Sequence, residues 1–210
     1  MNRRGISVLL AGVVVAALGI WGAVALAADR HDAGKACVSG HAMRANHRVQ
    51  GMHGMMRHAR VRDEADYLAT MVEHHREAIG AARELTRSDR PEMRRFGREI
   101  VRVQSHQVRQ MSRWLARWHP DQPAATYQPT MRDLSGLSGA ALDRAFLRDM
   151  VGHHMAAVMM SQWLLARDLD RHPSVARLAE NIRDSQHLEI QQMQRWYGEW
   201  FAGTAAPSCH

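Results

Sequence analysis

The stretch that decides the fold is Met71-Val72-Glu73-His74-His75, which recurs later as Met150-Val151-Gly152-His153-His154. Each copy lies among apolar residues spaced three and four apart, the spacing of one helix face. The segments that follow also match, because Gln107-x-x-Gln110-Met111-x-x-Trp114 aligns with Glu189-x-x-Gln192-Met193-x-x-Trp196. The sequence therefore predicts a helical hairpin that is present twice.

Breaks in the pattern divide the chain into these two hairpins, over residues 63–119 and 138–203. In the first, Ser88-Asp89 followed by Pro91 separates a helix over residues 63–85 from one that ends at Trp118. In the second, Ser138 can cap a helix that ends at Leu169, and His172-Pro173 starts the last helix. The linker of residues 120–138 is rich in Pro and Gly, which exclude a regular helix.

No strand signal of any length appears, so we predict an all-α, ferritin-like four-helix bundle. For the second helix we expect a buried stripe made of Phe96, Ile100, Val103, Gln107, Met111, Trp114 and Trp118.

The chain of 210 residues begins with Arg3 and Arg4, then an apolar run that ends in small residues. Residues 1–28 are therefore predicted to be a signal peptide or an uncleaved N-terminal membrane anchor. Both alternatives place the rest outside the cytoplasm, in the periplasm or cell envelope. Residues 29–62 are expected to be a flexible Met/His-rich segment, and residues 204–210 a short tail.

The formal charge of +7 does not indicate nucleic-acid binding. Lys35 is the only lysine, an exported chain does not meet cytoplasmic DNA or RNA, and no recognition helix or aromatic RNA motif is present. We interpret the arginines as a solvated basic surface, with contact to an anionic membrane as the lesser alternative.

The two cysteines, Cys37 and Cys209, lie near the two ends of the mature chain. In an exported protein such a pair favours a disulfide. The alternative is two thiolate ligands, with Cys209-His210 as a metal clamp.

The repeated motifs place a thioether one helical turn before two imidazoles, a donor set that suits copper. The predicted ligands are Met71, His74, His75, Met150, His153 and His154, with Met111 and Met193 from the partner helices. Glu189 lies on the core stripe and is expected to orient an imidazole. Met and His favour Cu(I), His can also hold Cu(II), and zinc is second. Ordinary core packing is the alternative for each residue taken singly.

A second predicted copper-binding segment is the N-terminal tract, with Met52, His53, Met55, Met56 and His58. By contrast, His106, His119, His172 and His187 stand alone in the sequence, and we interpret them as surface or edge residues. The motifs of di-iron proteins, c-type haem and zinc proteases are missing from the sequence.

Three segments carry a family resemblance: Asp143-x-x-Phe146-Leu147-x-x-Met150-Val151-x-His153-His154-x-x-Ala157-Val158-x-Met160, Met71-Val72-x-His74-His75-x-x-Ala78-Ile79, and Glu189-Ile190-x-x-Met193-x-x-Trp196. They resemble the paired signature of the exported family called domain of unknown function 305. The resemblance implies a ferritin-like four-helix fold and, for some members, periplasmic copper binding and tolerance through Met and His.

The first copy departs from this pattern. Gly80 and Ala81 stand where the second copy has Met159 and Met160, and Gln107 stands where the second copy has Glu189. We therefore expect the second half to bind metal more strongly.

These observations predict an exported copper-binding protein for copper buffering, transfer or tolerance, with copper-handling envelope proteins as partners. The alternative is a helical interaction module of the envelope with no metal role. We see no acid, base or nucleophile set and expect no enzymatic activity, although a metal-dependent oxidase stays open.

Overall fold

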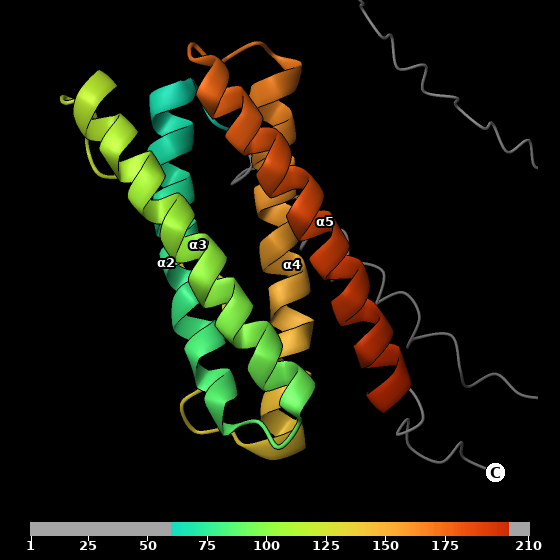
Figure 1. Ribbon diagram of the computed structural model, residues 1–210. Helices are drawn as coiled ribbons and strands as arrows, with labels where there is room; N and C mark the ends of the chain where they lie inside the picture. Colours follow the sequence, from blue (N-terminus) through green and yellow to red (C-terminus); the bar gives the residue numbers. More distant parts are fainter. Residues whose placement is uncertain (1–59, 202–210) are drawn as a thin grey trace, which may run out of the picture. The chain divides into compact units, whose positions relative to one another are not determined.

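The computed structural model describes residues 60–201, and these form four α-helices with one short 3-10 helix (Figure 1). The elements are α2 (Glu64–Glu84), η1 (Leu85–Arg87), α3 (Pro91–Trp118), α4 (Gly139–Ala166) and α5 (Pro173–Phe201). Residues 60–201 contain no strand, so the prediction of an all-α four-helix bundle is confirmed. The predicted leader, the N-terminal tract, Cys37 and Cys209 lie outside the described residues.

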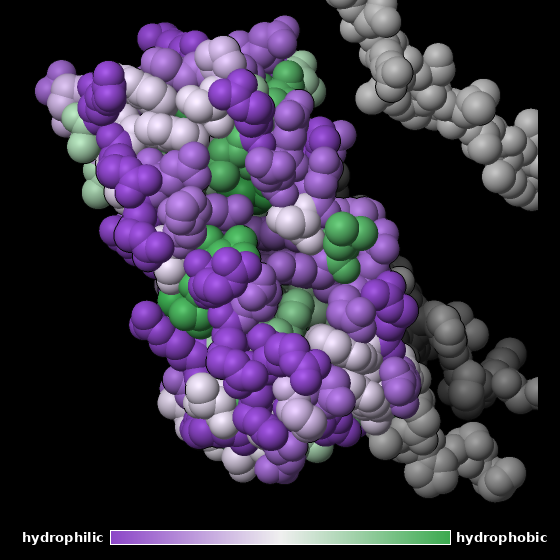
Figure 2. Space-filling model, in the orientation of Figure 1, coloured by the Kyte–Doolittle hydropathy of each residue, from purple (hydrophilic) through white to green (hydrophobic). Residues whose placement is uncertain are grey.

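The helices pack as two hairpins joined through their first members. α2 packs along α3, α4 packs along α5, and α2 and α4 contact each other between the two pairs. α3 and α5 are the outer helices on the face seen in Figure 1. That face is mostly hydrophilic, and hydrophobic atoms show mainly along the line between α3 and α5 (Figure 2). Because one histidine motif is on α2 and the other is on α4, the two motifs meet where these helices pack together.

The helix ends follow local chemistry, with two differences from the sequence prediction. Asp63 caps α2 by accepting the Asp66 N–H at 2.9 Å. Ser138 occupies the N-cap position of α4, but its side chain makes no capping hydrogen bond. Gly139 is needed there instead, because its φ is +51° and a Cβ would lie 2.8 Å from Asp89 Oδ2.

α4 ends at Ala166, earlier than the predicted Leu169. Asp168 adopts a left-handed φ of 50°, and the Leu169 N–H returns to the Leu164 carbonyl at 3.1 Å. The Asp168 N–H bonds the Leu165 carbonyl at 3.3 Å, which completes a Schellman motif. The usual glycine of this motif is replaced by aspartate, so the sequence did not reveal the stop.

The buried stripe of α3 differs from the predicted one. It consists of Met93, Gly97, Ile100, Gln104, Gln107 and Met111. Val103 and the three aromatic residues Phe96, Trp114 and Trp118 are only half-buried. The aromatic rings lie at the edge of the apolar clusters. A large aromatic ring can cover the seam from its edge, whereas the close approach of α2 and α3 requires small or slender residues inside it.

None of the helices among residues 60–201 is long and apolar enough to cross a bilayer.

α3 approaches α2 and η1 closely at Gly97, where a Cβ would lie 2.6 Å from the Ala82 carbonyl oxygen and 2.9 Å from Leu85 Cβ. We expect Gly97→Ala to destabilise the protein by about 1–3 kcal/mol, because the helices must move apart and this outweighs alanine's helix propensity of about 1 kcal/mol. Urea unfolding followed by circular dichroism measures the change.

The matched control is Gly80→Ala on α2, because a Cβ at Gly80 has nothing within 4 Å. This variant is expected to gain up to about 1 kcal/mol from helix propensity alone. Equal stability of the two variants would contradict a tight contact at Gly97.

A candidate metal centre of four buried histidines

His74, His75, His153 and His154 are almost fully buried at the contact between α2 and α4, each 3% exposed or less. The rings of His74 and His153 lie face to face across the contact, with centroids 3.7 Å apart and planes inclined by 34°. Each of these rings lies 6.2 Å from its sequence neighbour, His75 or His154. The two motifs are thus brought together as one group of imidazoles, called here the four-His cluster.

One nitrogen of every ring in the four-His cluster is held by a protein oxygen. The four contacts are His74 Nε2 to the His153 carbonyl (3.0 Å), His75 Nε2 to Gln107 Oε1 (2.9 Å), His153 Nε2 to Glu77 Oε2 (3.0 Å) and His154 Nε2 to Glu189 Oε2 (2.6 Å). Carbonyl and carboxylate oxygens only accept, so each Nε2 carries the proton and donates it. The lone pair of each neutral ring is therefore on Nδ1.

The four Nδ1 atoms are buried, and none has a hydrogen-bond partner among the described residues. A buried acceptor without a partner is uncommon and costly. Four of them in one cluster are not explained by packing, because any of these positions could hold an apolar residue instead. An imidazole whose Nε2–H is tied to oxygen while Nδ1 is unpaired is the usual arrangement of a histidine that ligates a metal.

The surroundings keep the rings of His74, His75 and His153 uncharged. Burial is the main cause that lowers the pKa of His74 well below its usual range, with further lowering from the neighbouring imidazoles. Burial likewise lowers the pKa of His75 to about 3, against a smaller opposite effect of Gln107. The pKa of His153 is also lowered by burial, although Glu77 partly opposes this. Neutral imidazole is the form that binds metals, so no proton has to be displaced at neutral pH.

Glu77 is a member of this site that the sequence prediction missed. Its carboxylate accepts from His153, from the Tyr127 hydroxyl and from the backbone N–H groups of Thr130 and Met131, the last two at 2.7 Å. Burial raises the pKa of Glu77, but these donors outweigh it and lower the pKa to about 2. Glu77 lies one helical turn after His74, which was a usable signal. The second copy has Ala156 at the matching position, so comparison of the repeats concealed it.

Glu189 was predicted to orient an imidazole, and its carboxylate accepts from His154. Gln107, at the matching position of α3, makes the equivalent contact with His75. At these two matching positions the halves share one geometry but differ by one charge.

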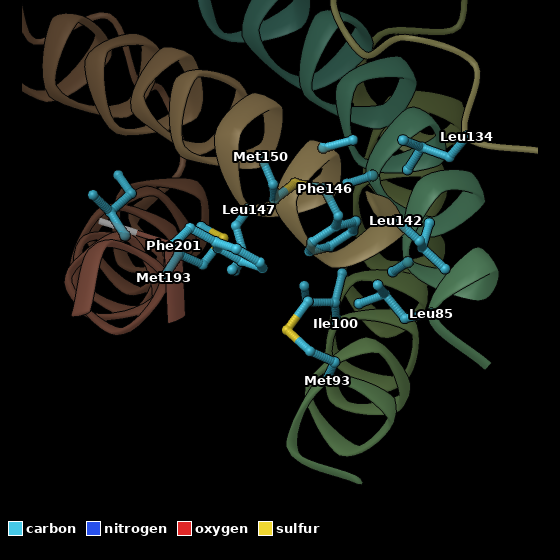
Figure 3. Close-up of a cluster of buried hydrophobic side chains, with 14 of the residues drawn as sticks. Leu85, Met93, Ile100, Leu134, Leu142, Phe146, Leu147, Met150, Met193 and Phe201 are labelled. Atoms are coloured by element: carbon cyan, nitrogen blue, oxygen red, sulfur yellow. The ribbon is translucent and has the colours of Figure 1, made fainter. Parts of the chain in front are cut away.

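The buried methionines form two groups, one in each apolar cluster of the bundle. One cluster contains Met71, Met111 and Met160, and the other contains Met93, Met150 and Met193. Figure 3 shows the second cluster, where side chains of α3, α4 and α5 and Leu134 of the linker gather. Each half therefore pairs its own two predicted methionines, and the four predicted thioethers do not gather in one place.

Met160 changes the expected imbalance between the halves. It belongs to the second copy of the motif, yet it packs in the cluster of Met71 and Met111 from the first half. Met160 therefore adds a third buried methionine to the cluster of the first half, which has Ala81 at the matching position. Each of the two apolar clusters contains three buried methionines. Helix pairing, which the repeat alone does not specify, decides this.

Two of the histidines taken as isolated do not stand alone. His119 and His172 both bond the buried carboxylate of Glu64, with N···O distances of 3.0 and 2.6 Å. His106 and His187 are exposed, as predicted. No spacing pattern in the sequence links His119 and His172 to Glu64, because the three residues lie at the ends of different helices.

The fold and the site together define a protein made of a duplicated helical hairpin with a histidine cluster at its centre. The family model described as "Domain of unknown function (DUF305)" matches residues 21–115, 64–129 and 117–197. The chain belongs to this family, and the resemblance of the paired motifs is confirmed. No curated protein matches the chain in sequence.

Solved structures of the same family are similar along most of their length. CopM in its Cu(I)-bound form is 30% identical, with a TM-score of 0.60 over 67% of this chain and 99% of its own. A DUF305 fragment from Deinococcus radiodurans is 32% identical, with a TM-score of 0.57 over 65% of this chain and 95% of its own. A DUF305 protein from Streptomyces coelicolor, described as secreted, is 24% identical, with a TM-score of 0.60 over 70% and 98%.

Proposed function

We propose that this protein binds copper through Met and His side chains, outside the cytoplasm, for copper buffering, transfer or tolerance, without an enzymatic role. The observation that carries the proposal is the set of four buried Nδ1 atoms without a partner among residues 60–201. Support also comes from the family relationship, because CopM was solved with Cu(I), with Cu(II) and with silver.

The donor chemistry favours Cu(I) inside the bundle. Thioethers are soft ligands that select Cu(I), neutral imidazoles also bind copper, and each half combines both kinds. Met71 lies one turn before His74 and His75, and Met111 lies one turn after Gln107, the partner of His75. The second half repeats this with Met150, His153, His154 and Met193. A monovalent ion brings one charge into the core, and the carboxylates of Glu77 and Glu189 on the neighbouring rings offset it.

The four-His cluster does not by itself present three nitrogens at one point. Among the described residues, the one group of three His, Cys, Asp or Glu ligand atoms within 4.8 Å of one another lies elsewhere. A metal held here therefore needs sulfur as well as nitrogen. This favours Cu(I) over zinc, which takes a closed tetrahedral set of Cys, His and carboxylate ligands.

The proposal includes the N-terminal tract and the place of action. Met52, His53, Met55, Met56 and His58 would capture copper or pass it on. The apolar run of residues 6–27 supports export to the periplasm or cell envelope, as a cleaved signal or as an anchor. Partners that handle copper in the envelope follow from such a role.

The test is a titration of the full chain with Cu(I), without oxygen, in competition with a chromophoric Cu(I) chelator. We expect the double variant His75→Gln/His154→Gln to lose copper from the bundle, with at least a tenfold weaker affinity for the remaining ion, because one imidazole of each half is removed. In the metal-free wild type, long-range proton–nitrogen NMR should show the Nε2–H tautomer for all four rings. Addition of Ag(I) should shift the Nδ1 signals.

The control is His106→Gln/His187→Gln, which removes two exposed histidines and should leave Cu(I) binding unchanged. Circular dichroism checks that both double variants remain folded. Cu(I) affinity of the His75/His154 variant equal to that of wild type would refute the bundle site. No copper binding by wild type would instead support the interaction module without a metal role.

A further inference from the structure

A second group of chemical side chains lies at one end of the bundle, away from the four-His cluster. Glu64 is the first residue of α2, His119 follows the end of α3, and His172 precedes α5. Glu64 Oε1 lies 3.0 Å from His119 Nε2 and 2.6 Å from His172 Nδ1. These three atoms lie within 4.8 Å of one another. Glu64 and His74 are ten residues apart on α2, about 15 Å along its axis.

A purely structural tie between these helix ends would not need both imidazoles. Glu64 Oε2 already accepts the backbone N–H groups of Arg171 and His172, at 2.6 and 2.8 Å. In the second half the matching carboxylate is Asp143, which is held by Arg90 at 3.1 Å. An arginine makes the ion pair but has no lone pair for a metal. The first half therefore places two metal-binding side chains where the second half uses a simple cation.

The state of these groups suits a divalent ion. Burial alone would raise the pKa of Glu64, but hydrogen bonds from the two imidazoles and two backbone amides lower it, so the carboxylate is ionised. The side chain of Glu64 is 1% exposed, whereas those of His119 and His172 are 14% and 34% exposed. Water can therefore reach the rings. The neutral form of imidazole can carry its proton on either nitrogen, so each ring can offer a lone pair to an ion on the side that faces Glu64.

We propose that Glu64, His119 and His172 form a second metal site that takes a divalent ion, Cu(II) in preference to Zn(II). Two imidazoles and a carboxylate are hard to borderline ligands without sulfur, a set that suits both ions. In this order of affinities Cu(II) binds more strongly than Zn(II). This site would hold copper as Cu(II), whereas the Met/His site inside the bundle would hold Cu(I). The two sites share no ligand. An ion held there would join the start of α2, the end of α3 and the start of α5.

Trp118 supplies a reporter for this site. Its indole stacks on the His172 ring, with centroids 3.7 Å apart and planes inclined by 6°. Cu(II) bound to His172 would lie next to this indole and would quench its fluorescence. The full chain has six tryptophans, so the variant Trp118→Phe is needed to assign the quenched signal.

The experiment titrates the full chain with Cu(II) and follows tryptophan fluorescence and electron paramagnetic resonance. For wild type we expect a quenching phase that Trp118→Phe removes, and a Cu(II) signal with coupling to two imidazole nitrogens. His119→Gln/His172→Gln should lose this phase and one equivalent of Cu(II), because glutamine keeps a hydrogen bond to Glu64 but is a poor ligand. His172→Arg copies the Arg90–Asp143 pair and gives a second variant that retains the tie while removing the ligand.

His106→Gln/His187→Gln is the matched control and should retain both the quenching phase and the equivalent of Cu(II). Wild-type quenching that persists unchanged in both His119→Gln/His172→Gln and His172→Arg would overturn the second site. Cu(I) binding in the chelator competition should be the same in these variants as in wild type. A loss of the Cu(II) site with Cu(I) binding intact therefore separates this proposal from the proposed function.

Discussion

Acid is expected to unfold the metal-free protein by about pH 4–5, because histidines that are buried in the folded state take up protons when the chain unfolds. The folded pKa values of His74, His75 and His153 are lowered by burial, whereas an unfolded histidine titrates near 6.5. Below about pH 6.5 the unfolded chain binds protons that the folded chain does not. Stability is therefore complete above that pH and falls as the pH decreases toward the folded pKa values.

The size of this effect is large for a domain of this kind. A histidine whose folded pKa lies well below 6.5 lowers the free energy of unfolding by about 1.4 kcal/mol for every pH unit, so His74 and His75 together contribute about 3 kcal/mol per unit. His153 adds to this slope in the same direction. Total stabilities are about 5–15 kcal/mol, and the protein should therefore unfold by about pH 4–5. Glu77 adds a second loss at lower pH, because its pKa is lowered to about 2 and its stabilisation disappears between about 4.5 and that value.

Urea unfolding at a series of pH values measures the slope. His75→Gln should have a shallower pH dependence, by about one proton, and His106→Gln should match wild type because His106 is exposed. A stability that is flat between pH 7 and pH 5 would mean that the cluster does not exclude protons as its burial implies.

Glu77→Ala is expected to destabilise the protein by about 3–5 kcal/mol, the second large effect. The side chain of Glu77 is 12% exposed and accepts four donors, three of them from the linker between the hairpins. Alanine would leave the His153 Nε2–H and the Thr130 and Met131 N–H groups without an acceptor. The loss should appear in urea unfolding and as faster hydrogen exchange of the Thr130 and Met131 amides.

Glu73→Ala is the matched control, because Glu73 is on the same helix and makes an ion pair with the exposed Arg76. Its effect should be below about 1 kcal/mol. Glu77→Gln retains an oxygen acceptor but not the charge, so it should fall between the two. Equal stability of Glu77→Ala and Glu73→Ala would show that the carboxylate does not hold the linker.

Local sequence patterns predicted much of the fold. The spacing of apolar residues predicted the helices, and Pro91 and Pro173 start α3 and α5 as expected. The sequence did not predict where α4 ends, because Asp168 occupies the position that is usually glycine in a Schellman motif. The predicted buried stripe of α3 was wrong at Phe96, Val103, Trp114 and Trp118, because hydrophobicity does not show whether a side chain lies inside the helix contact or covers its edge.

The candidate site divides in the same way. The repeat predicted that two Met-x-x-His-His motifs belong to one bundle, since both residue type and spacing are properties of one helix. Three features depend on contacts between helices: the stacking of His74 on His153, the acceptor role of Glu77 and the exchange of Met160 into the opposite half. These contacts join residues far apart in the chain, and no local pattern contains the distance between two helices.

The sequence by itself determined the four helices, their duplication and the Met and His donors that each hairpin carries, because helix formation and periodicity are local. Only the tertiary structure decided which nitrogen of each histidine is available, because the acceptor of each Nε2–H comes from another helix, a linker-bound carboxylate or a facing carbonyl. It also decided that Glu64, His119 and His172 meet, since three helix ends come together there through packing and not through spacing.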